Sequence, residues 1–237
     1  MSTPRAILLV LAKAPVPGQV KTRLCPPLTP TQAARIAAAA LLDTLDAVLA
    51  VPQTAAVVAL AGRLDRVADP APLHAALQAA SVIRQRGSTL GERIAAAHAA
   101  AAALAPGTPV LQIGMDTPQA DARLLGHCLD ILDRPGTDAG TGTDAALGLA
   151  RDGGWWALGL RDPALAGLIA AVPTSRPDTG TTTLATLRAA GCHVAELPQL
   201  SDVDTADDAV AVAAGVPASR FGTAVRAALA PTAEGVR

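Results

Sequence analysis

The chain has 237 residues, of which 51% are hydrophobic and 16% are charged, and its formal net charge is −1. This composition is typical of a globular protein and excludes a disordered chain. The near-neutral charge gives no basic surface for nucleic acid. The length suits one domain, which we expect to span residues 1–237 with a C-terminal helix from about residue 218.

The three cysteines, Cys25, Cys128 and Cys192, lie far apart and form no C-x-x-C pair. This spacing gives no zinc or redox motif. The odd count and the absence of a signal-peptide pattern favour a reducing cytoplasm. The longest apolar runs are too short to span a bilayer, so we expect a cytoplasmic protein without membrane contact.

Apolar runs and helical patterns alternate from the start of the chain. Residues 6–12 are apolar throughout, as in a buried parallel strand. A helix is expected over residues 30–50, because Thr29 and Gln32 form a capping box and Pro30 suits the first helical position. Further strands are predicted at residues 54–60, 81–85 and 109–114, with a helix at 89–104 and another that begins at Pro118.

The second half continues this alternation after a Gly- and Asp-rich segment, residues 133–144, that is typical of a loop. Strands are predicted at residues 145–150, 155–160 and 194–198, and helices at 181–190, 206–214 and 218–229. The pattern predicts an α/β protein, a Rossmann-like three-layer α/β/α sandwich around a mostly parallel mixed sheet. Such sheets bind ligands at the carboxyl ends of their strands.

A stiff, positively charged loop follows the first strand. It contains Lys13, Lys21 and Arg23, and no acidic residue precedes Asp43. Two prolines stiffen the loop, and Gly18 lets its backbone turn or approach a ligand. The cations would suit a polyphosphate, although a solvated basic loop is the alternative. The glycine that precedes the lysine of a P-loop is missing, so this is no Walker motif.

Carboxylates follow two later strands. Asp116 ends the fourth strand, where it could bind a hard cation or simply cap the next helix. Asp202 and Asp204 share one face of an extended segment and could converge on one ion. Asp207 and Asp208 fall in the first turn of a helix, where the helix dipole alone explains acidic residues.

Two more segments could contact substrates. Gln85, Gly87 and Gly91 follow the third strand, and an amide beside two glycines could accept a flat base. Trp155 and Trp156 follow a tight D-G-G turn. Because side chains alternate along a strand, one tryptophan should face the core and the other could form the floor of a substrate pocket.

These motifs occur in a fixed order: A-K-A-P-V-P-G-Q-V-K-T-R-L at 12–24, Q-x-G-x-x-L-G-E-R at 85–93, G-x-D-x-P at 114–118, D-G-G at 152–154 and L-P-Q-L-S-D-V-D-T-A-D-D at 197–208. The ordered set resembles a small bacterial family of GT-A-type transferases, rSAM/selenodomain-associated transferase 1, in the nucleotide-diphospho-sugar transferase superfamily. The resemblance covers nearly the whole chain and implies a GT-A fold.

The resemblance also implies roles for individual residues. The cations that bind phosphate would be Lys13, Lys21 and Arg23, and the base would contact Gln85 and Gly91. Asp116 and Asp204 would be the ligands of Mg²⁺ (or Mn²⁺). The acceptor would bind beside Asp152, Gly153, Gly154 and Trp155. Gly18 and Gly87 complete the expected nucleotide site. Lys21, Arg23 and Asp116 would carry catalysis, and Asp202 is the alternative second metal ligand.

The absence of a nucleophile–histidine pair fits chemistry that needs positioning and charge stabilisation. A single Asp116 in place of a D-x-D pair, together with the basic loop, favours nucleotidyl transfer with pyrophosphate release. The acceptor would be small and phosphorylated or hydroxylated. Glycosyl transfer from a nucleotide sugar is the alternative, and a non-catalytic nucleotide-binding module is a third. Met115 and Leu149 replace residues that are usual in the family, so the identity of the acceptor stays open. The sequence also leaves open whether the protein forms a homodimer.

Overall fold

The computed structural model describes residues 3–134 and 142–230. Its strands form one seven-stranded sheet in the order β3-β2-β1-β4-β6-β5-β7. All neighbours are parallel except where β6 is involved, since β6 runs antiparallel to β4 and β5. The strands are β1 (Ala6–Lys13), β2 (Thr54–Ala61), β3 (Ser81–Arg84), β4 (Val110–Gly114), β5 (Ala145–Ala150), β6 (Trp155–Leu160) and β7 (Val194–Leu200).

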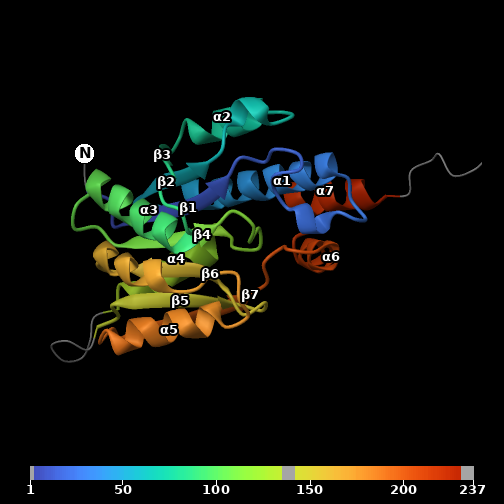
Figure 1. Ribbon diagram of the computed structural model, residues 1–237. Helices are drawn as coiled ribbons and strands as arrows, with labels where there is room; N and C mark the ends of the chain where they lie inside the picture. Colours follow the sequence, from blue (N-terminus) through green and yellow to red (C-terminus); the bar gives the residue numbers. More distant parts are fainter. Residues whose placement is uncertain (1–2, 135–141, 231–237) are drawn as a thin grey trace, which may run out of the picture.

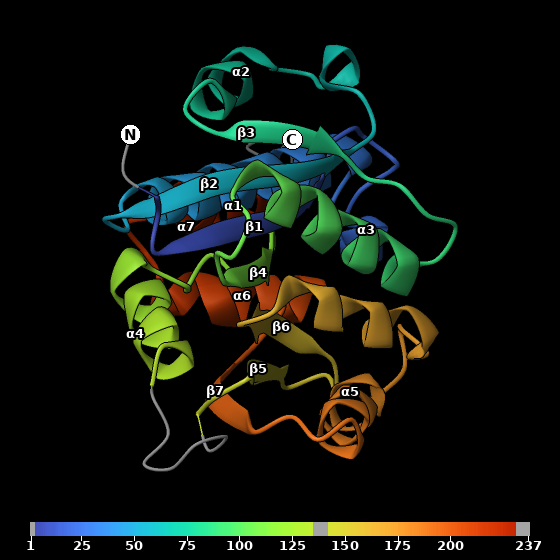
Figure 2. The same cartoon turned by 90° about the vertical axis from the view of Figure 1, so that its left-hand side faces the viewer.

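Helices cover both faces of this sheet (Figures 1 and 2). The α-helices are α1 (Pro30–Leu49), α2 (Ala71–Leu77), α3 (Leu90–Leu104), α4 (Ala122–Leu132), α5 (Thr179–Ala189), α6 (Ala206–Gly215) and α7 (Arg220–Leu229). The 3-10 segments are η1 (Thr22–Leu24), η2 (Leu64–Arg66) and η3 (Pro163–Ala171). The predicted three-layer α/β/α sandwich with a mostly parallel mixed sheet is confirmed.

Strand β1 is apolar throughout because both of its faces are covered. Leu8 and Val10 belong to a core that includes α1 and α4. Ile7 and Leu9 point the other way, into a core with α3. Side chains that alternate between two cores leave no solvent-facing position, which explains the continuous apolar run.

A separate apolar core lies beside the sheet and supports the first loop. Leu24 of η1 is fully buried in it, together with Ile36 of α1, Val203 and Phe221 of α7. The loop after β1 is therefore anchored to the C-terminal helices. This packing joins residues from opposite ends of the chain.

All the strands predicted from sequence are present, and the Thr29–Gln32 capping box is confirmed. Helix α2 and the 3-10 segments were not predicted. Most of the expected 133–144 loop, residues 135–141, lies outside the described residues, as do residues 231–237. The proposed domain limits of 1–237 therefore stay a prediction.

The prediction that Pro118 begins a helix is wrong. Helix α4 begins at Ala122, and Asp121 caps it by accepting a hydrogen bond from the Leu124 amide at 2.7 Å. The preceding segment is held elsewhere, because the Gln119 amide donates to the Ser201 carbonyl at 2.6 Å. This contact with the end of β7 delays the helix by one turn.

Within residues 3–134 and 142–230, no helix combines the length and the apolar character needed to cross a membrane.

Candidate functional site

The predicted motifs meet at one edge of the sheet. The parallel strands end there and β6 begins there, so the loops that follow β1, β3, β4, β5 and β7 share this edge. The basic loop comes from β1, Asp116 from β4, Asp152 from β5, and Asp202 and Asp204 from β7. This is where α/β sheets bind ligands.

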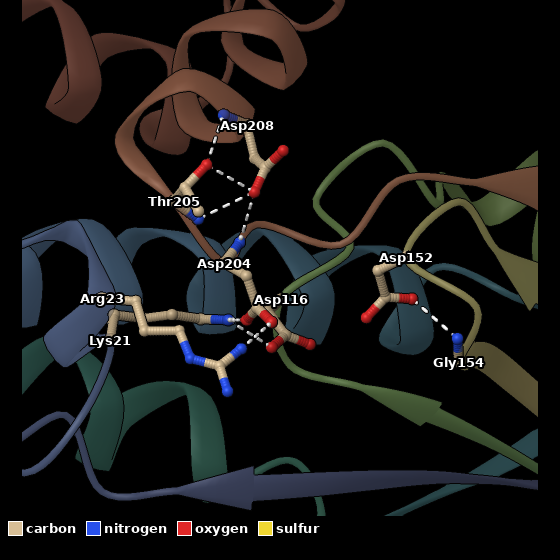
Figure 3. Close-up of polar contacts among 8 residues, drawn as sticks. All are labelled: Lys21, Arg23, Asp116, Asp152, Gly154, Asp204, Thr205 and Asp208. Atoms are coloured by element: carbon tan, nitrogen blue, oxygen red, sulfur yellow. Dashed lines mark hydrogen bonds and ion pairs between the residues drawn. The ribbon is translucent and has the colours of Figure 1, made fainter. Parts of the chain in front are cut away.

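At this edge, the Lys21 ammonium contacts the carboxylates of both Asp116 and Asp204 (Figure 3). Its Nζ atom is 2.6 Å from Asp116 Oδ2 and 3.2 Å from Asp204 Oδ1. Arg23 approaches Asp204 from the rim, with Nη1 at 3.1 Å from Oδ2. The structure therefore brings together four of the predicted residues, and it links Asp204 to Asp116 through a lysine.

The backbone at Lys21 has an unusual conformation. Lys21 adopts a left-handed conformation with φ 47° and ψ 41°, and the short helix η1 follows directly. Non-glycine residues rarely adopt this conformation unless their surroundings hold them there. Leu24, buried three residues later, supplies such an anchor.

Charge is concentrated here. Burial by itself lowers the pKa of Lys21, but the charges and hydrogen bonds of Asp116 and Asp204 outweigh it, so the pKa lies above its ordinary value. Burial, followed by the charges of Asp116 and Asp152, raises the pKa of Asp202 to about 8. The Asp202 Oδ1 atom is buried without a hydrogen-bond partner. Carboxylates thus exceed cations in this part of the site.

The G-x-D spacing has a steric reason. A Cβ atom on Gly114 would lie 2.7 Å from Asp116 Oδ1, so glycine leaves room for this carboxylate over the end of β4. Asp116 does not cap a helix, because Asp121 caps α4. The interpretation of Asp116 as an ordinary helix cap is therefore excluded.

Asp204 is held by the start of α6. Asp208 Oδ2 accepts hydrogen bonds from the backbone amide of Asp204 at 3.3 Å and from that of Thr205 at 2.8 Å (Figure 3). Thr205 and Asp208 form a capping box. Sequence reasoning assigned Asp208 to the helix dipole and missed its support of Asp204, although the T-x-x-D spacing signals it.

Lys13 and Gln85 make mainly structural contacts. The Lys13 ammonium donates to the Gln19 carbonyl, and its backbone amide donates to the Met115 sulfur at 3.1 Å. The Gln85 amide donates to the carbonyls of Ala12 at 2.8 Å and Ala59 at 2.9 Å, which joins the ends of three strands. The expected base contact would have to use the Gln85 carbonyl oxygen.

The predicted glycines differ in their surroundings. Gly91 is buried, and a Cβ atom there would lie 2.6 Å from the Ile169 carbonyl, so it allows α3 to pack on η3. Gly87 has φ +127° and lies against Glu92. Gly18 has φ +73° with open space around its missing side chain. Of the three, only Gly18 faces space that a ligand could fill.

The D-G-G turn between β5 and β6 is packed tightly. Asp152 Oδ1 accepts a hydrogen bond from the Gly154 amide at 2.8 Å (Figure 3). A Cβ atom on Gly153 would lie 1.9 Å from the Pro177 carbonyl. Trp156 is buried and donates to the Pro198 carbonyl at 2.8 Å, whereas Trp155 is half-buried. The expectation that one tryptophan faces the core is confirmed; that Trp155 contacts an acceptor stays a prediction.

No three His, Cys, Asp or Glu side chains of residues 3–134 and 142–230 form a ready metal site. The donor chemistry nevertheless fits a divalent cation, because Asp116 and Asp204 already converge on one positive charge. The buried, unpartnered oxygen of Asp202 lies among the same charges. Mg²⁺ is commonly held by one or two carboxylates together with substrate phosphates.

Two surface hollows lie at the opposite edge of the sheet. One of about 400 Å³ lies where β2 and β3 begin, and one of about 560 Å³ lies between α3 and η3. Neither is lined by the charged residues described above. The charged cluster is therefore the stronger candidate for a catalytic site.

A family model and several solved structures match this chain. A family model described as "Uncharacterized protein conserved in bacteria (DUF2064)" matches residues 44–176, more than half of the chain. The matched range includes Asp116 and Asp152, whereas Lys21, Arg23 and Asp204 lie outside it. None of the curated proteins matches the chain.

Solved structures share the whole fold. A candidate nucleotide-diphospho-sugar transferase from Desulfovibrio desulfuricans G20 is 26% identical with a TM-score of 0.78, over 94% of this chain and 95% of that one. A cytidylyltransferase from Leptospira borgpetersenii is 12% identical with a TM-score of 0.56, over 94% and 93%. The mannosyltransferase PcManGT from Pyrobaculum calidifontis, in complex with GDP-Man and Mn²⁺, is 15% identical with a TM-score of 0.53, over 98% and 67%.

Proposed function

The chain belongs to the DUF2064 family, and we propose that this member is a transferase that binds a nucleotide at the carboxyl edge of its sheet. The observation that carries the proposal is the cluster in which Lys21 and Arg23 face Asp116 and Asp204. Cations on a stiff loop beside paired carboxylates suit a polyphosphate and its divalent cation. The transferases among the similar structures support the same class of reaction.

The finer proposal is nucleotidyl transfer from a nucleoside triphosphate. Lys21 and Arg23 would bind the phosphates that depart as pyrophosphate, while an acceptor oxygen attacks the α-phosphorus and the bond to the β-phosphate oxygen breaks. Charge would build up on the departing pyrophosphate. Two cations from one anchored loop would stabilise that charge without covalent chemistry by the protein.

A divalent cation, Mg²⁺ or Mn²⁺, would be held by Asp116 and Asp204 and would neutralise phosphate charge. Neighbouring residues of the protein would position these two carboxylates. Gly114 leaves room for Asp116, and Asp208 fixes the backbone at Asp204. The acceptor would bind on the side of Asp152, Gly153 and Gly154, where the tight turn against Pro177 gives a fixed wall.

Glycosyl transfer from a nucleotide sugar is the second candidate. It is supported by the description of the Desulfovibrio desulfuricans protein and by the GDP-Man bound to the Pyrobaculum calidifontis enzyme. Nucleotidyl transfer ranks first because the loop of β1 places two cations against the carboxylate pair, which suits a departing pyrophosphate.

The test is calorimetric titration with the four ribonucleoside triphosphates and common nucleotide sugars, with and without Mg²⁺. We expect Mg²⁺-dependent binding of one triphosphate, followed by pyrophosphate release once acceptors are supplied. Binding of a nucleotide sugar in preference to its triphosphate would favour glycosyl transfer. If the protein bound no nucleotide of either class, the proposed function would be wrong.

A further inference from the structure

Lys21 occupies the position at which Asp116 and Asp204 come together (Figure 3). Its side chain is only 10% exposed, whereas that of Arg23 is 72% exposed. We propose that Lys21 is an internal counter-ion, which closes the cation site of the nucleotide-free protein until polyphosphate draws its ammonium away. This inference rests on the proposed function, because that function places a divalent cation on the same two carboxylates.

The ammonium and a divalent cation would compete for the same oxygens. Lys21 Nζ contacts Asp116 Oδ2 at 2.6 Å and Asp204 Oδ1 at 3.2 Å, so it already uses one oxygen of each carboxylate. A second cation on this pair would adjoin the ammonium. Positive charges at such short range repel strongly. Divalent-cation affinity should therefore be low while Lys21 stays in place.

The surrounding carboxylates explain why Lys21 stays there in the absence of ligand. The charges of Asp116, Asp152 and Asp204 each raise the pKa of Asp202, so the neighbourhood holds four acidic groups. Among the charges that most affect the pKa of Asp202, Lys21 is the one cation, and it lowers that pKa. Its ammonium relieves the repulsion between carboxylates that would otherwise face one another unscreened.

The loop is also built to let the ammonium leave. Leu24 anchors its backbone in the core of α1, α6 and α7, so the Lys21 main chain keeps its place. A lysine side chain swings on a flexible four-carbon stem. A polyphosphate at this loop would offer Lys21 new negative partners beside Arg23. Polyphosphate and cation would then each raise the affinity of the other, because such coupling is reciprocal.

The test measures Mn²⁺ binding to the nucleotide-free, full-length protein. Lys21→Met should bind Mn²⁺ at least about tenfold more tightly than the wild type, because a unit positive charge next to the ion is gone. Arg66→Met is the matched control and should leave the affinity unchanged, since Arg66 lies at an exposed position of η2 outside the site. The double variant Lys21→Met, Asp204→Asn should lose the gain. Equal or weaker Mn²⁺ binding by Lys21→Met would overturn the proposal.

A second measurement needs no variant, because Lys13 and Lys21 are the only two lysines of the chain. An amine-reactive reagent should label the exposed Lys13 readily and Lys21 poorly. Saturating Mn²⁺ should raise Lys21 labelling severalfold relative to Lys13 by displacing its ammonium. An unchanged labelling ratio would also overturn the internal counter-ion.

The two proposals can fail separately. If nucleotides bind the wild type but neither Mn²⁺ affinity nor Lys21 labelling changes as expected, the internal counter-ion alone is wrong. If both change but no nucleotide binds, the counter-ion stands and the proposed function is wrong.

Discussion

The Lys21 ammonium lies 2.6 Å from the Asp116 carboxylate, although 95 residues separate the two in sequence. The contact joins the loop of β1 to the end of β4. Asp116→Asn removes the charge while keeping the shape of the side chain. We expect Mg²⁺-dependent nucleotide affinity to fall by about 10- to 100-fold. This fold-change corresponds to the free energy that one interaction with a charged group typically contributes.

Calorimetric titration with and without Mg²⁺ checks this. Asp130→Asn is the control, because Asp130 forms an exposed ion pair with Arg5 away from the site. If Asp116→Asn bound nucleotide and Mg²⁺ as the wild type does, Asp116 would not be a ligand.

Arg23 gives a prediction that separates binding from stability. Its side chain is 72% exposed and its ion pair with Asp204 is at the surface, so the pair should add little to the free energy of unfolding. Arg23→Gln should nevertheless weaken triphosphate binding by roughly tenfold, with the largest loss at low salt. Arg66→Gln, at an exposed position of η2, should change neither quantity. Titrations with triphosphate at two salt concentrations measure the affinity, and thermal unfolding measures the stability. An equal loss of triphosphate affinity in Arg23→Gln and Arg66→Gln would contradict the prediction.

Gly114→Ala tests whether the position of the Asp116 carboxylate matters for binding. The added Cβ would lie 2.7 Å from Asp116 Oδ1, and the flexible carboxylate must shift to make room. Metal-dependent nucleotide affinity should fall by roughly threefold to tenfold while the thermal midpoint changes little. Gly126→Ala is the control, because nothing lies within 4 Å of its added Cβ. A large drop in the thermal midpoint of Gly114→Ala without an effect on affinity would assign Gly114 to folding.

The fold could be predicted because its signals are local. The apolar run of β1 needs two covered faces, and the Thr29–Gln32 box sets the start of α1. The start of α4 was predicted wrongly, because the contact between Gln119 and Ser201 joins segments 82 residues apart. A proline rule acting on neighbouring residues could not anticipate that contact.

The site was predictable as a set of residues but not as a set of contacts. Lys21, Arg23, Asp116 and Asp204 follow from strand ends and motif order, whereas neither signal indicates the left-handed backbone at Lys21 or the position of its ammonium between two carboxylates. The loop that carries Lys21 is anchored through Leu24, which packs against the distant C-terminal helices. Gln85 shows the opposite case, since strand carbonyls engage the amide that sequence reasoning assigned to a base.

The D-G-G turn gives a prediction about stability. Gly153 has φ +90°, and its added Cβ would lie 1.9 Å from the Pro177 carbonyl. Gly153→Ala should lower the free energy of unfolding by about 3 kcal/mol, from backbone strain and the clash together. Gly191→Ala, at φ +86° with nothing within 4 Å, carries the strain alone and should cost about 1 kcal/mol. Urea unfolding measures both values, and equal costs would show that the turn yields to Pro177 without penalty.

His98 gives a prediction about pH. It is fully buried in α3, its Nε2 lies 3.0 Å from Gln112 Oε1, and burial lowers its pKa from 6.5 to about 4. Well above pH 6.5 the imidazole is neutral in both the folded and the unfolded chain, so the free energy of unfolding does not depend on its protonation. As the pH falls below that value, the unfolded chain binds a proton that the folded chain does not. The free energy of unfolding should then decrease, by about 2 kcal/mol near pH 5 and by about 3 kcal/mol below pH 4.

Urea unfolding of the wild type and of His98→Gln near pH 7.5 and pH 5 isolates this effect, because the carboxylates titrate alike in both proteins. Glutamine keeps an amide beside Gln112 but cannot take up the proton, so the variant should lose about 2 kcal/mol less than the wild type between these conditions. His74→Gln, at an exposed position of α2, should retain the wild-type pH dependence. If His98→Gln showed the same pH dependence as the wild type, the buried imidazole would accept its proton within the folded chain, and α3 would have to open toward solvent to admit it.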